Sequence, residues 1–435
     1  AIGIAEGLDY SNPIVAEYIQ KMTKRMENYP QLKKYATFVI GQKPIPIESI
    51  DFLIAKDNVS ISEYEKILNY LKLFCSTTKT PVFYNFGTII DPNNHKGYND
   101  IMSLEYQAYY LNSRYLLRNQ IGNAGVFFWT YNDYFTENPL GKSAINEPFI
   151  CYSGIVGNKS QRLSFNMLKA LFNNEEAPIV NPGQVETDFP VVYLIAGGIA
   201  FLLWGILINR SRRFREHTFR SLFRTYNFFA DIRDRRLISN FQTGVFGITL
   251  SIILALYLVS MLSYWKTNES INHLLNLLLV DDFIKEWVYR LSWKVDYFII
   301  VLTVLIFIKI NVIALILKVA SLFVRSKIFL SDTFKMVIWA GAPLLFFLPI
   351  SIFINRLLPI SPFLANVSNI LLILFLLFWL QRLIKSIWIV FDVRPSKVYA
   401  ISLIVIFFIC TAYLSYIEYK FSFFEYVSQY LGLYF

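Results

Sequence analysis

The sequence predicts a protein of two parts, an α/β domain over residues 1–190 followed by an all-α polytopic membrane bundle. Hydrophobic residues make up 55% of the 435 residues and charged residues only 17%, a balance more apolar than that of soluble domains. The apolar residues are concentrated after residue 190. Before it, short β-type runs alternate with helical stretches, which is typical of a parallel sheet covered by helices.

Six apolar stretches predict the transmembrane helices. Each is close to the roughly 20 residues that cross ~30 Å of hydrocarbon, and they lie at 191–208, 243–264, 297–317, 336–355, 364–381 and 398–416. Lys309 is the main charge inside them, and we favour snorkelling or a bundle-lining position over a transport role. Gly341, Pro343 and Pro349 interrupt the fourth stretch and predict a kink there.

The connecting loops predict the orientation of the bundle. Lys and Arg are concentrated in 209–240, 318–335 and 382–397, whereas 265–296 and 356–363 are nearly neutral. Basic loops stay in the cytoplasm, so both termini are expected to face away from it. We therefore expect an integral protein of a bacterial inner membrane, with its soluble domain on the extracytoplasmic side.

The net charge of +10 also raises the question of nucleic-acid binding. Topology explains the basic segment 209–240 without it, and aromatic residues at near-helical spacing among its arginines predict an amphipathic helix on an anionic leaflet. The lipid bilayer is thus an expected partner and nucleic acid is not. Residues 417–435 are predicted to be an aromatic interfacial tail.

The soluble half contains five strand candidates and four helix candidates. The strands are predicted near 2–5, 35–40, 50–55, 81–86 and 125–131, and the helices near 12–26, 62–75, 103–119 and 160–172. Residues 179–190 are predicted to be a linker to the first span. The alternation implies a parallel sheet or barrel.

Three local motifs support a family resemblance. Residues 124–134, Ala-Gly-Val-Phe-Phe-Trp-Thr-Tyr-Asn-Asp-Tyr, resemble the last barrel strand of family 2 glycoside hydrolases, in which a Trp lies under the sugar ring. Glu105-Tyr106-Gln107-Ala108 resembles a Glu-Tyr-Gln helix of that family, and Ser153-Gly154-Ile155-Val156 its closing segment. The resemblance covers residues 1–175, most closely 80–175.

The resemblance implies that residues 1–178 form the C-terminal portion of a (β/α)8 TIM barrel. The fold class expected for the whole chain is then a partial TIM-barrel-like α/β domain followed by the membrane bundle. The family's barrel has eight strands, and this stretch supplies about the last five. An upstream half preceding residue 1 is our first expectation, and a shortened, remodelled domain the second.

The family's chemistry needs two carboxylates, about 5–5.5 Å apart in retaining enzymes, at the carboxyl ends of strands. Ile4-Ala5-Glu6-Gly7 matches the acid/base motif except that Ala5 replaces an Asn. Glu6 is the candidate acid; an exposed strand-end Glu is an equal alternative. Asn85 occupies the nucleophile position in Thr80-Pro81-Val82-Phe83-Tyr84-Asn85-Phe86-Gly87. A neutral amide cannot form the glycosyl ester, so the resemblance implies an impaired catalyst.

The resemblance also implies residues that bind substrate. Trp129 would stack on a sugar, Asn132 and Asp133 would bond its hydroxyls, and Tyr84 would lie beside the nucleophile position. The alternative is that Trp129 packs the barrel mouth. No metal or cofactor is expected.

The leading expectation is a membrane-anchored protein, similar to glycoside hydrolase family 2, that binds a glycan or glycoconjugate outside the cytoplasm and is catalytically impaired. One alternative is an active glycosidase or transglycosidase. Another is a membrane trafficking or transport scaffold carried by the bundle, because residues 209–416 resemble the Yip-type multi-helix membrane domain in helix count, orientation and the Pro-containing fourth span. The oligomeric state is left open.

Overall fold

A computed structural model of the chain describes most of its residues. These are 2–5, 13–26, 29, 31–39, 50–56, 68–69, 71–73, 75, 81–121, 125–136, 147–157, 160–183, 191–235, 239–266, 275–276, 278–279, 281–324, 327–358, 361–421 and 424. The chain divides into two compact units, one of residues 1–187 with 423–435 and the other of residues 188–422.

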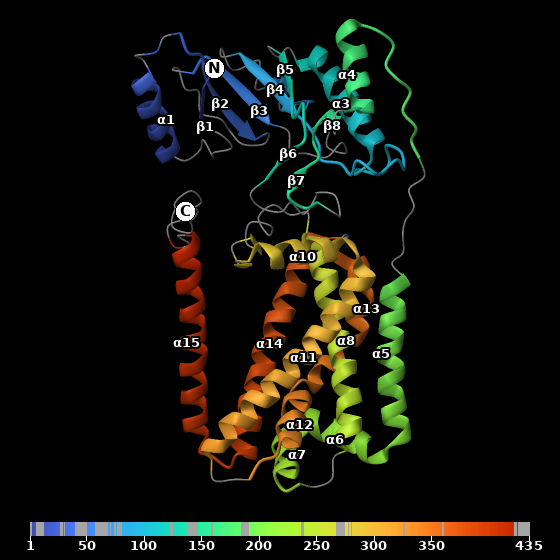
Figure 1. Cartoon of the computed structure of the whole chain (residues 1–435), viewed down its shortest axis with the longest axis vertical. Helices are drawn as coiled ribbons and strands as arrows, with labels where there is room; N and C mark the ends of the chain where they lie inside the picture. The colour runs from blue at the N-terminus through green and yellow to red at the C-terminus, as the bar shows by residue number, and fades with distance from the viewer. Residues whose placement is uncertain are drawn as a thin grey trace. The chain divides into compact units, whose positions relative to one another are not determined.

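The first unit contains a five-stranded parallel sheet (Figure 1) whose strand order is the order of the chain. The strands are β1 (Ile2–Ala5), β2 (Lys34–Val39), β3 (Phe52–Lys56), β4 (Val82–Phe86) and β5 (Gly125–Phe128). Right-handed crossovers that add strands in one direction place every connection on the same side of a sheet. Helices are therefore expected on one face only.

The core of this unit lies on that helical face. Alternate side chains of the central strands are buried there, among them Phe38, Tyr84 and Phe86. They pack with residues of three helices, α1 (Pro13–Arg25), α3 (Leu104–Ile121) and α4 (Leu163–Asn173). All three helices thus share one face of the sheet.

The opposite face of the sheet carries a row of aromatic rings. Tyr35, Phe52, Phe83 and Phe127 come from four successive strands, and consecutive ring centroids are 5.4, 5.2 and 5.1 Å apart. Helices on one face and parallel strands in chain order are the arrangement of a barrel segment. The described strands nevertheless do not close into a barrel, because β1 and β5 are the two ends of the sheet. The expected α/β domain is therefore present, and the described strands form an open sheet instead of the expected barrel.

After β5 the chain forms two short antiparallel pairs. β6 (Tyr134–Phe135) pairs with β7 (Ile150–Cys151), and β8 (Val156–Gly157) pairs with β9 (Ser160–Gln161). The first residues of the predicted linker also belong to this unit, since Tyr98 N–H donates to Asn181 O at 2.9 Å and Asn99 N–H to Pro182 O at 3.0 Å. The remainder of that linker, 184–190, lies outside the described residues.

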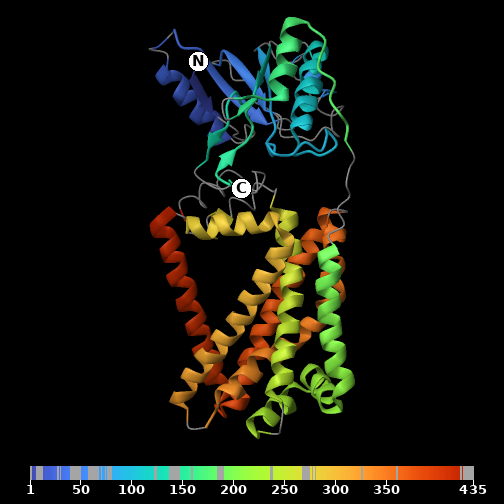
Figure 2. The ribbon, with the colours of Figure 1, turned by 45° about the vertical axis from the view of Figure 1, so that its right-hand side comes forward.

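The second unit is helical (Figures 1 and 2). In chain order its helices are α5 (Val191–Arg210), α6 (Arg212–Phe223), α7 (Thr225–Arg233), α8 (Asn240–Trp265), α10 (Asp282–Trp293), α11 (Val295–Ala320), the 3-10 turn η3 (Ser321–Phe323), α12 (Leu330–Ala340), the 3-10 segment η4 (Ala342–Phe346), α13 (Phe347–Leu357), α14 (Pro362–Val390) and α15 (Pro395–Phe421). Six candidate membrane spans are present among the described residues, and each overlaps one predicted stretch. The protein is therefore a membrane protein by helix length and composition.

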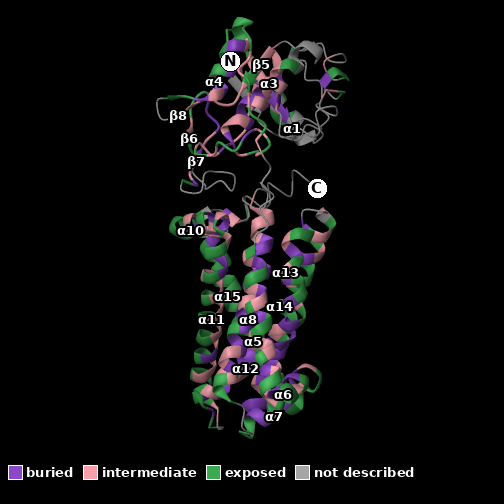
Figure 3. Ribbon diagram, turned by 90° about the vertical axis from the view of Figure 1, so that its right-hand side faces the viewer, coloured by how far each residue is buried: buried purple, intermediate pink, exposed green. Residues whose placement is uncertain are grey.

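Two spans form the centre of the bundle. In the most apolar 18-residue stretch of each span, 67% of the residues of α8 and 61% of those of the α12–α13 span are buried, compared with 6% of those of α15. Figure 3 colours the helices by burial. Trp339 of α12 is fully buried, with its ring 4.8–5.4 Å from those of Phe214, Phe228 and Phe246. This aromatic cluster joins α6, α7, α8 and α12.

The basic segment 209–240 is part of the bundle. It forms two helices, α6 and α7, whose Phe214, Phe228 and Phe229 are buried in the core. Its other aromatic residues face outward, with Phe219 57% and Phe223 66% exposed. The expected amphipathic character is present. The buried side of the segment packs against protein, and the exposed side presents aromatic rings to the surroundings.

The predicted interruption of the fourth span is also present. Regular α-helix stops at Ala340, and η4 follows with i→i+3 geometry, since Leu344 N–H donates to Gly341 O at 2.9 Å. Pro343 has no N–H for the carbonyl of Trp339, four residues earlier. The buried Arg382 of α14 donates instead, from Nη2 to Trp339 O at 3.3 Å and from Nε to Ala340 O at 3.0 Å.

Candidate functional site

Asn85 lies near the carboxyl end of β4, on the sheet face that carries the aromatic row. It is in register with Lys56 of β3 and Phe127 of β5. Its Oδ1 is buried and has no hydrogen-bond partner among the described residues. An unpaired buried polar atom costs about 1–3 kcal/mol, so a ligand hydroxyl that donates to this oxygen would be favoured. Lys56, which sequence reasoning missed, is identifiable as the last residue of the neighbouring strand.

Trp129 follows the last residue of β5, next to Asn85's strand. Its backbone N–H donates to Phe86 O at 3.0 Å, and the Trp129–Thr130 peptide bond is cis. The side chain is half-buried, with its ring edge-on to Tyr134 at 6.2 Å. The structure thus brings the predicted stacking residue and the predicted nucleophile position to adjacent strand ends.

Gly87 makes this close approach possible. A Cβ on residue 87 would lie 1.9 Å from Trp129 O and 2.9 Å from the indole ring. Real Cβ atoms do not approach other atoms this closely, so any larger residue would displace Trp129. The glycine at the end of the motif is therefore required sterically by Trp129, a requirement that the sequence alone does not show.

Asp133 has a different environment from the one predicted. Arg162 binds both of its carboxylate oxygens, with Nη1–Oδ1 at 2.8 Å and Nη2–Oδ2 at 2.6 Å, and Gly154 N–H donates to Oδ1 at 3.0 Å. The pair is largely buried, and such charges require partners. Asp133 thus positions the chain after Trp129 rather than offering a free carboxylate to a ligand. Nothing in the spacing of the sequence indicates this pair.

Asn132 lies at the rim of a pocket of about 490 Å³ beside β6 and β7. Its lining combines aromatic, polar and aliphatic residues, namely Asn132, Asp133, Tyr134, Phe135, Glu147, Ile150, Tyr152, Val156 and Gly157. Phe135 is 81% exposed, and Tyr152 donates its hydroxyl to Glu147. Apolar rings with a few convergent polar groups are typical of binding sites for small polar molecules. The sequence reasoning missed Phe135, Glu147 and Tyr152, which no motif marks.

Cys151 of β7 lies in the chain between Ile150 and Tyr152, two residues that line this pocket. Burial raises the pKa of its thiol, so the group stays protonated at neutral pH. A protonated buried thiol is a weak nucleophile, which leaves Cys151 as a packing residue.

Tyr84 does not belong to the site. It is fully buried between the sheet and its helices, where it packs against Phe86 with ring centroids 5.1 Å apart. Successive strand residues point to opposite faces, so Tyr84 and Asn85 cannot reach the same ligand. The predicted binding role of Tyr84 is therefore corrected to one in the core. Glu6, the predicted acid, lies outside the described residues.

The three motifs of the sequence meet in space. Gln107 of α3 donates from Nε2 to Ser153 O at 3.0 Å and accepts from Ser164 Oγ at 2.8 Å. Ser153 Oγ is 2.9 Å from Oγ1 of Thr130, the residue that follows Trp129 in the chain. The Glu105–Ala108 helix, the 124–134 segment and the 153–156 segment therefore support one another around the site.

Comparison of the sequence with models of known protein families gives no match, and none of the curated proteins matches it significantly. The function proposed below therefore rests on the geometry of the chain itself.

Proposed function

We propose that the chain is a membrane-anchored protein, similar to glycoside hydrolase family 2, whose α/β domain binds a glycan or glycoconjugate without retaining hydrolysis. The observation that carries this proposal is the pairing of Asn85 and Trp129 at adjacent strand ends. Trp129 offers an aromatic face, and Asn85 offers an amide whose Oδ1 has no partner among the described residues. Stacking and hydrogen bonding are the two contacts that a sugar ring requires, and neither needs a nucleophile.

Impaired hydrolysis follows from the residue at the nucleophile position, and three acids of the surrounding segments have partners of their own. Asp133 is held by Arg162, and Asp91 accepts the backbone N–H of Asn93 at 3.0 Å. Glu105 is in the first turn of α3, with Oε1 3.6 Å from His95 Nδ1. A retaining mechanism needs a carboxylate at the nucleophile position, and Asn85 cannot supply one. We expect a loss of several orders of magnitude relative to an intact enzyme.

The pocket beside β6 and β7 extends the proposed binding surface. Tyr134 contacts Trp129 and also lines the 490 Å³ pocket with Asn132 and Phe135. A glycan longer than one sugar could therefore stack on Trp129 and continue toward Phe135. We infer an oligosaccharide or glycoconjugate rather than a monosaccharide.

The membrane unit supplies the anchor in this proposal. Basic residues in α6, α7 and the loop before α15 mark the cytoplasmic side. The α/β domain then faces away from the cytoplasm, in a bacterial inner membrane, where glycans of the cell envelope are accessible.

The proposal is tested by glycan binding of the full-length chain in detergent micelles or nanodiscs. A glycan microarray identifies the preferred sugar, and titration gives its affinity. We expect Trp129→Ala to weaken binding by about 1–3 kcal/mol, the scale of a lost aromatic stack. Trp287→Ala, which removes a 50% exposed tryptophan of α10, is the matched control and should bind as the parent does.

The microarray distinguishes the alternatives. Absence of any glycan bound above the Trp129→Ala background contradicts the proposal. Equal binding by the parent and Trp129→Ala places the sugar elsewhere. A sugar–protein adduct trapped with a fluorinated glycoside and seen by mass spectrometry would favour the alternative of an active glycosidase or transglycosidase.

A further inference from the structure

Lys309 is a cation placed deep in a membrane span. It lies fourteen residues after Val295 and eleven before Ala320, the ends of α11. At 1.5 Å per residue these separations are about 21 and 16 Å, which places Lys309 near the middle of the hydrocarbon. A charge at this depth costs several kcal/mol unless it is paired or reaches water.

Three other cations of the membrane unit have acceptors within the described chain. Arg382 donates to the carbonyls of Ala340, Ser221 and Trp339, and Lys318 donates to Ile328 O at 2.6 Å. Lys266 Nζ is 3.5 Å from Ser292 O and lies over the Trp293 ring. Lys309, in contrast, has no hydrogen bond or ion pair with any residue in the described part of the chain. The described part of the chain therefore supplies no partner that offsets the cost of this charge.

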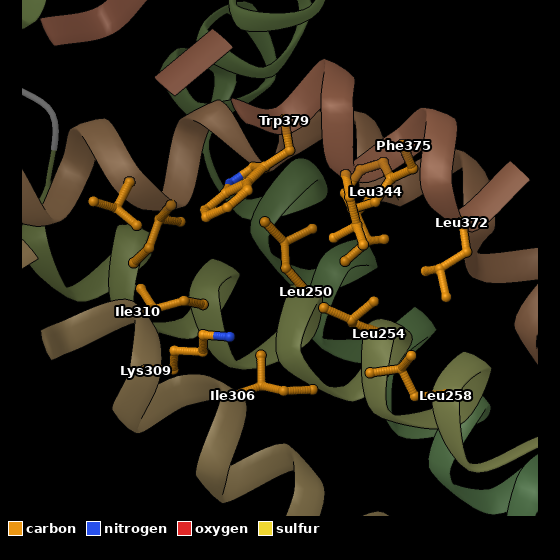
Figure 4. Close-up of a pocket in the computed structure, with 14 residues that line it drawn as sticks. Leu250, Leu254, Leu258, Ile306, Lys309, Ile310, Leu344, Leu372, Phe375 and Trp379 are labelled. Carbon is orange, nitrogen blue, oxygen red and sulfur yellow. The ribbon is translucent and has the colours of Figure 1, made fainter. Parts of the chain in front are cut away.

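Lys309 also lines an apolar pocket of about 280 Å³, about nine times the ~30 Å³ that a water molecule occupies in the liquid. Ten of its lining residues are labelled in Figure 4, and Lys309 extends from α11 toward the leucines of α8, while α14 contributes Leu372, Phe375 and Trp379 from the other side. Lys309 is the single charged group among the lining residues. Apolar cavities stay dry or take apolar ligands.

The pocket opens to the surface of the bundle. Lys309 is exposed, as is Leu376 of α14 at 45%, whereas Phe375, Val337 and Ile338 are buried behind them. In a membrane this surface faces lipid. The pocket is therefore accessible to a molecule that diffuses within the bilayer.

We propose that this pocket binds a long-chain carboxylic acid, with the carboxylate on the Lys309 ammonium and the alkyl chain among the leucines of α8 and α14. One ammonium and one carboxylate form a neutral pair, which removes the cost of a lone charge in hydrocarbon. A diacyl phospholipid fits less well because its phosphate stays at the interface, about half the ~30 Å core away from this depth. The proposal is independent of glycan binding by the α/β domain.

The test uses the full-length protein in phosphatidylcholine nanodiscs and a palmitic acid that carries a diazirine in its chain. Photolabelled peptides are mapped by mass spectrometry, and unlabelled palmitic acid or hexadecanol competes. We expect labels on α8, α11 and α14, with palmitic acid at least tenfold more effective than hexadecanol. In Lys309→Met the two competitors should become equal, and Lys309→Arg should restore the preference.

Two further variants separate the pocket from the charge. Leu254→Trp fills the pocket while leaving Lys309 in place, and should abolish labelling of α8. Lys397→Met removes an exposed lysine at the start of α15 and should label as the parent does. Gel filtration confirms that each variant is folded.

Three outcomes overturn the proposal. Equal competition by palmitic acid and hexadecanol in the parent protein means that Lys309 does not recognise the acid. Labels spread over α15 with no preference for the pocket mean that the acid only partitions into the bilayer. A parent dimer that Lys309→Met converts to monomer assigns Lys309 to a second copy of the chain.

Discussion

At the residue scale, strand alternation decides which side chains of the nucleophile motif face a ligand. Asn85 lies on the open face of the sheet, and Tyr84 is buried on the other, although they are neighbours in sequence. The sequence motif locates the strand, but only the packing of its side chains with residues of the helices shows which face they cover. The same limit applies to Asp133, because its partner Arg162 is 29 residues away.

The Asp133–Arg162 pair gives a prediction at this scale. Arg162→Met leaves a largely buried carboxylate without its bidentate partner, and breaking a buried pair in this way costs about 3–5 kcal/mol. Proteolysis of the α/β domain at increasing urea concentration, in the full-length protein, measures the loss. Asn132→Ala, at an exposed neighbouring position, should leave this stability within about 0.5 kcal/mol of the parent.

Equal stability of the parent and Arg162→Met would contradict this account of Asp133. It would return the carboxylate to the set of candidate ligand-binding groups. Asn132→Ala is then informative a second time, because it should weaken glycan binding although it leaves stability unchanged.

At the element scale, the fourth span shows how a helix break is supported in a bundle. Gly341 and Pro343 predict the break from sequence, and the structure adds that Arg382 of α14 donates to the carbonyls released there. The sequence could also place the six spans, because twenty apolar residues admit few other interpretations. It could not divide 209–240 into α6 and α7. The same types of aromatic residue occur on the lipid face and in the protein core, so the sequence does not show which of them pack inside the bundle.

Arg382 gives the prediction that belongs to this scale. Arg382→Met leaves the carbonyls of Trp339, Ala340 and Ser221 without their donor, at about 1–3 kcal/mol for each buried acceptor. We expect a clear fall in the melting temperature of the detergent-solubilised protein, partly recovered by Arg382→Lys. Lys397→Met, at an exposed lysine, is the control. An Arg382→Met protein that melts with the parent would show that water satisfies these carbonyls.

At the scale of the whole molecule, two different rules organise the two units. In the first unit, one-directional addition of parallel strands places α1, α3 and α4 on one face and leaves the aromatic row and Asn85 on the other. In the second, apolar length and the positions of basic loops define the spans and their proposed orientation. The alternation of strands and helices was predictable, whereas closure of the sheet was not, since five strands can form an open sheet or part of a barrel.

The central claim is that the α/β domain binds a glycan and does not hydrolyse it. The most direct measurement incubates the full-length protein with the glycan selected on the microarray and follows binding and product mass together. We predict saturable binding that Trp129→Ala weakens, with the mass of the glycan unchanged after many times the residence time of the complex. Release of a shorter sugar by the parent protein, abolished in Glu6→Gln, would contradict the claim.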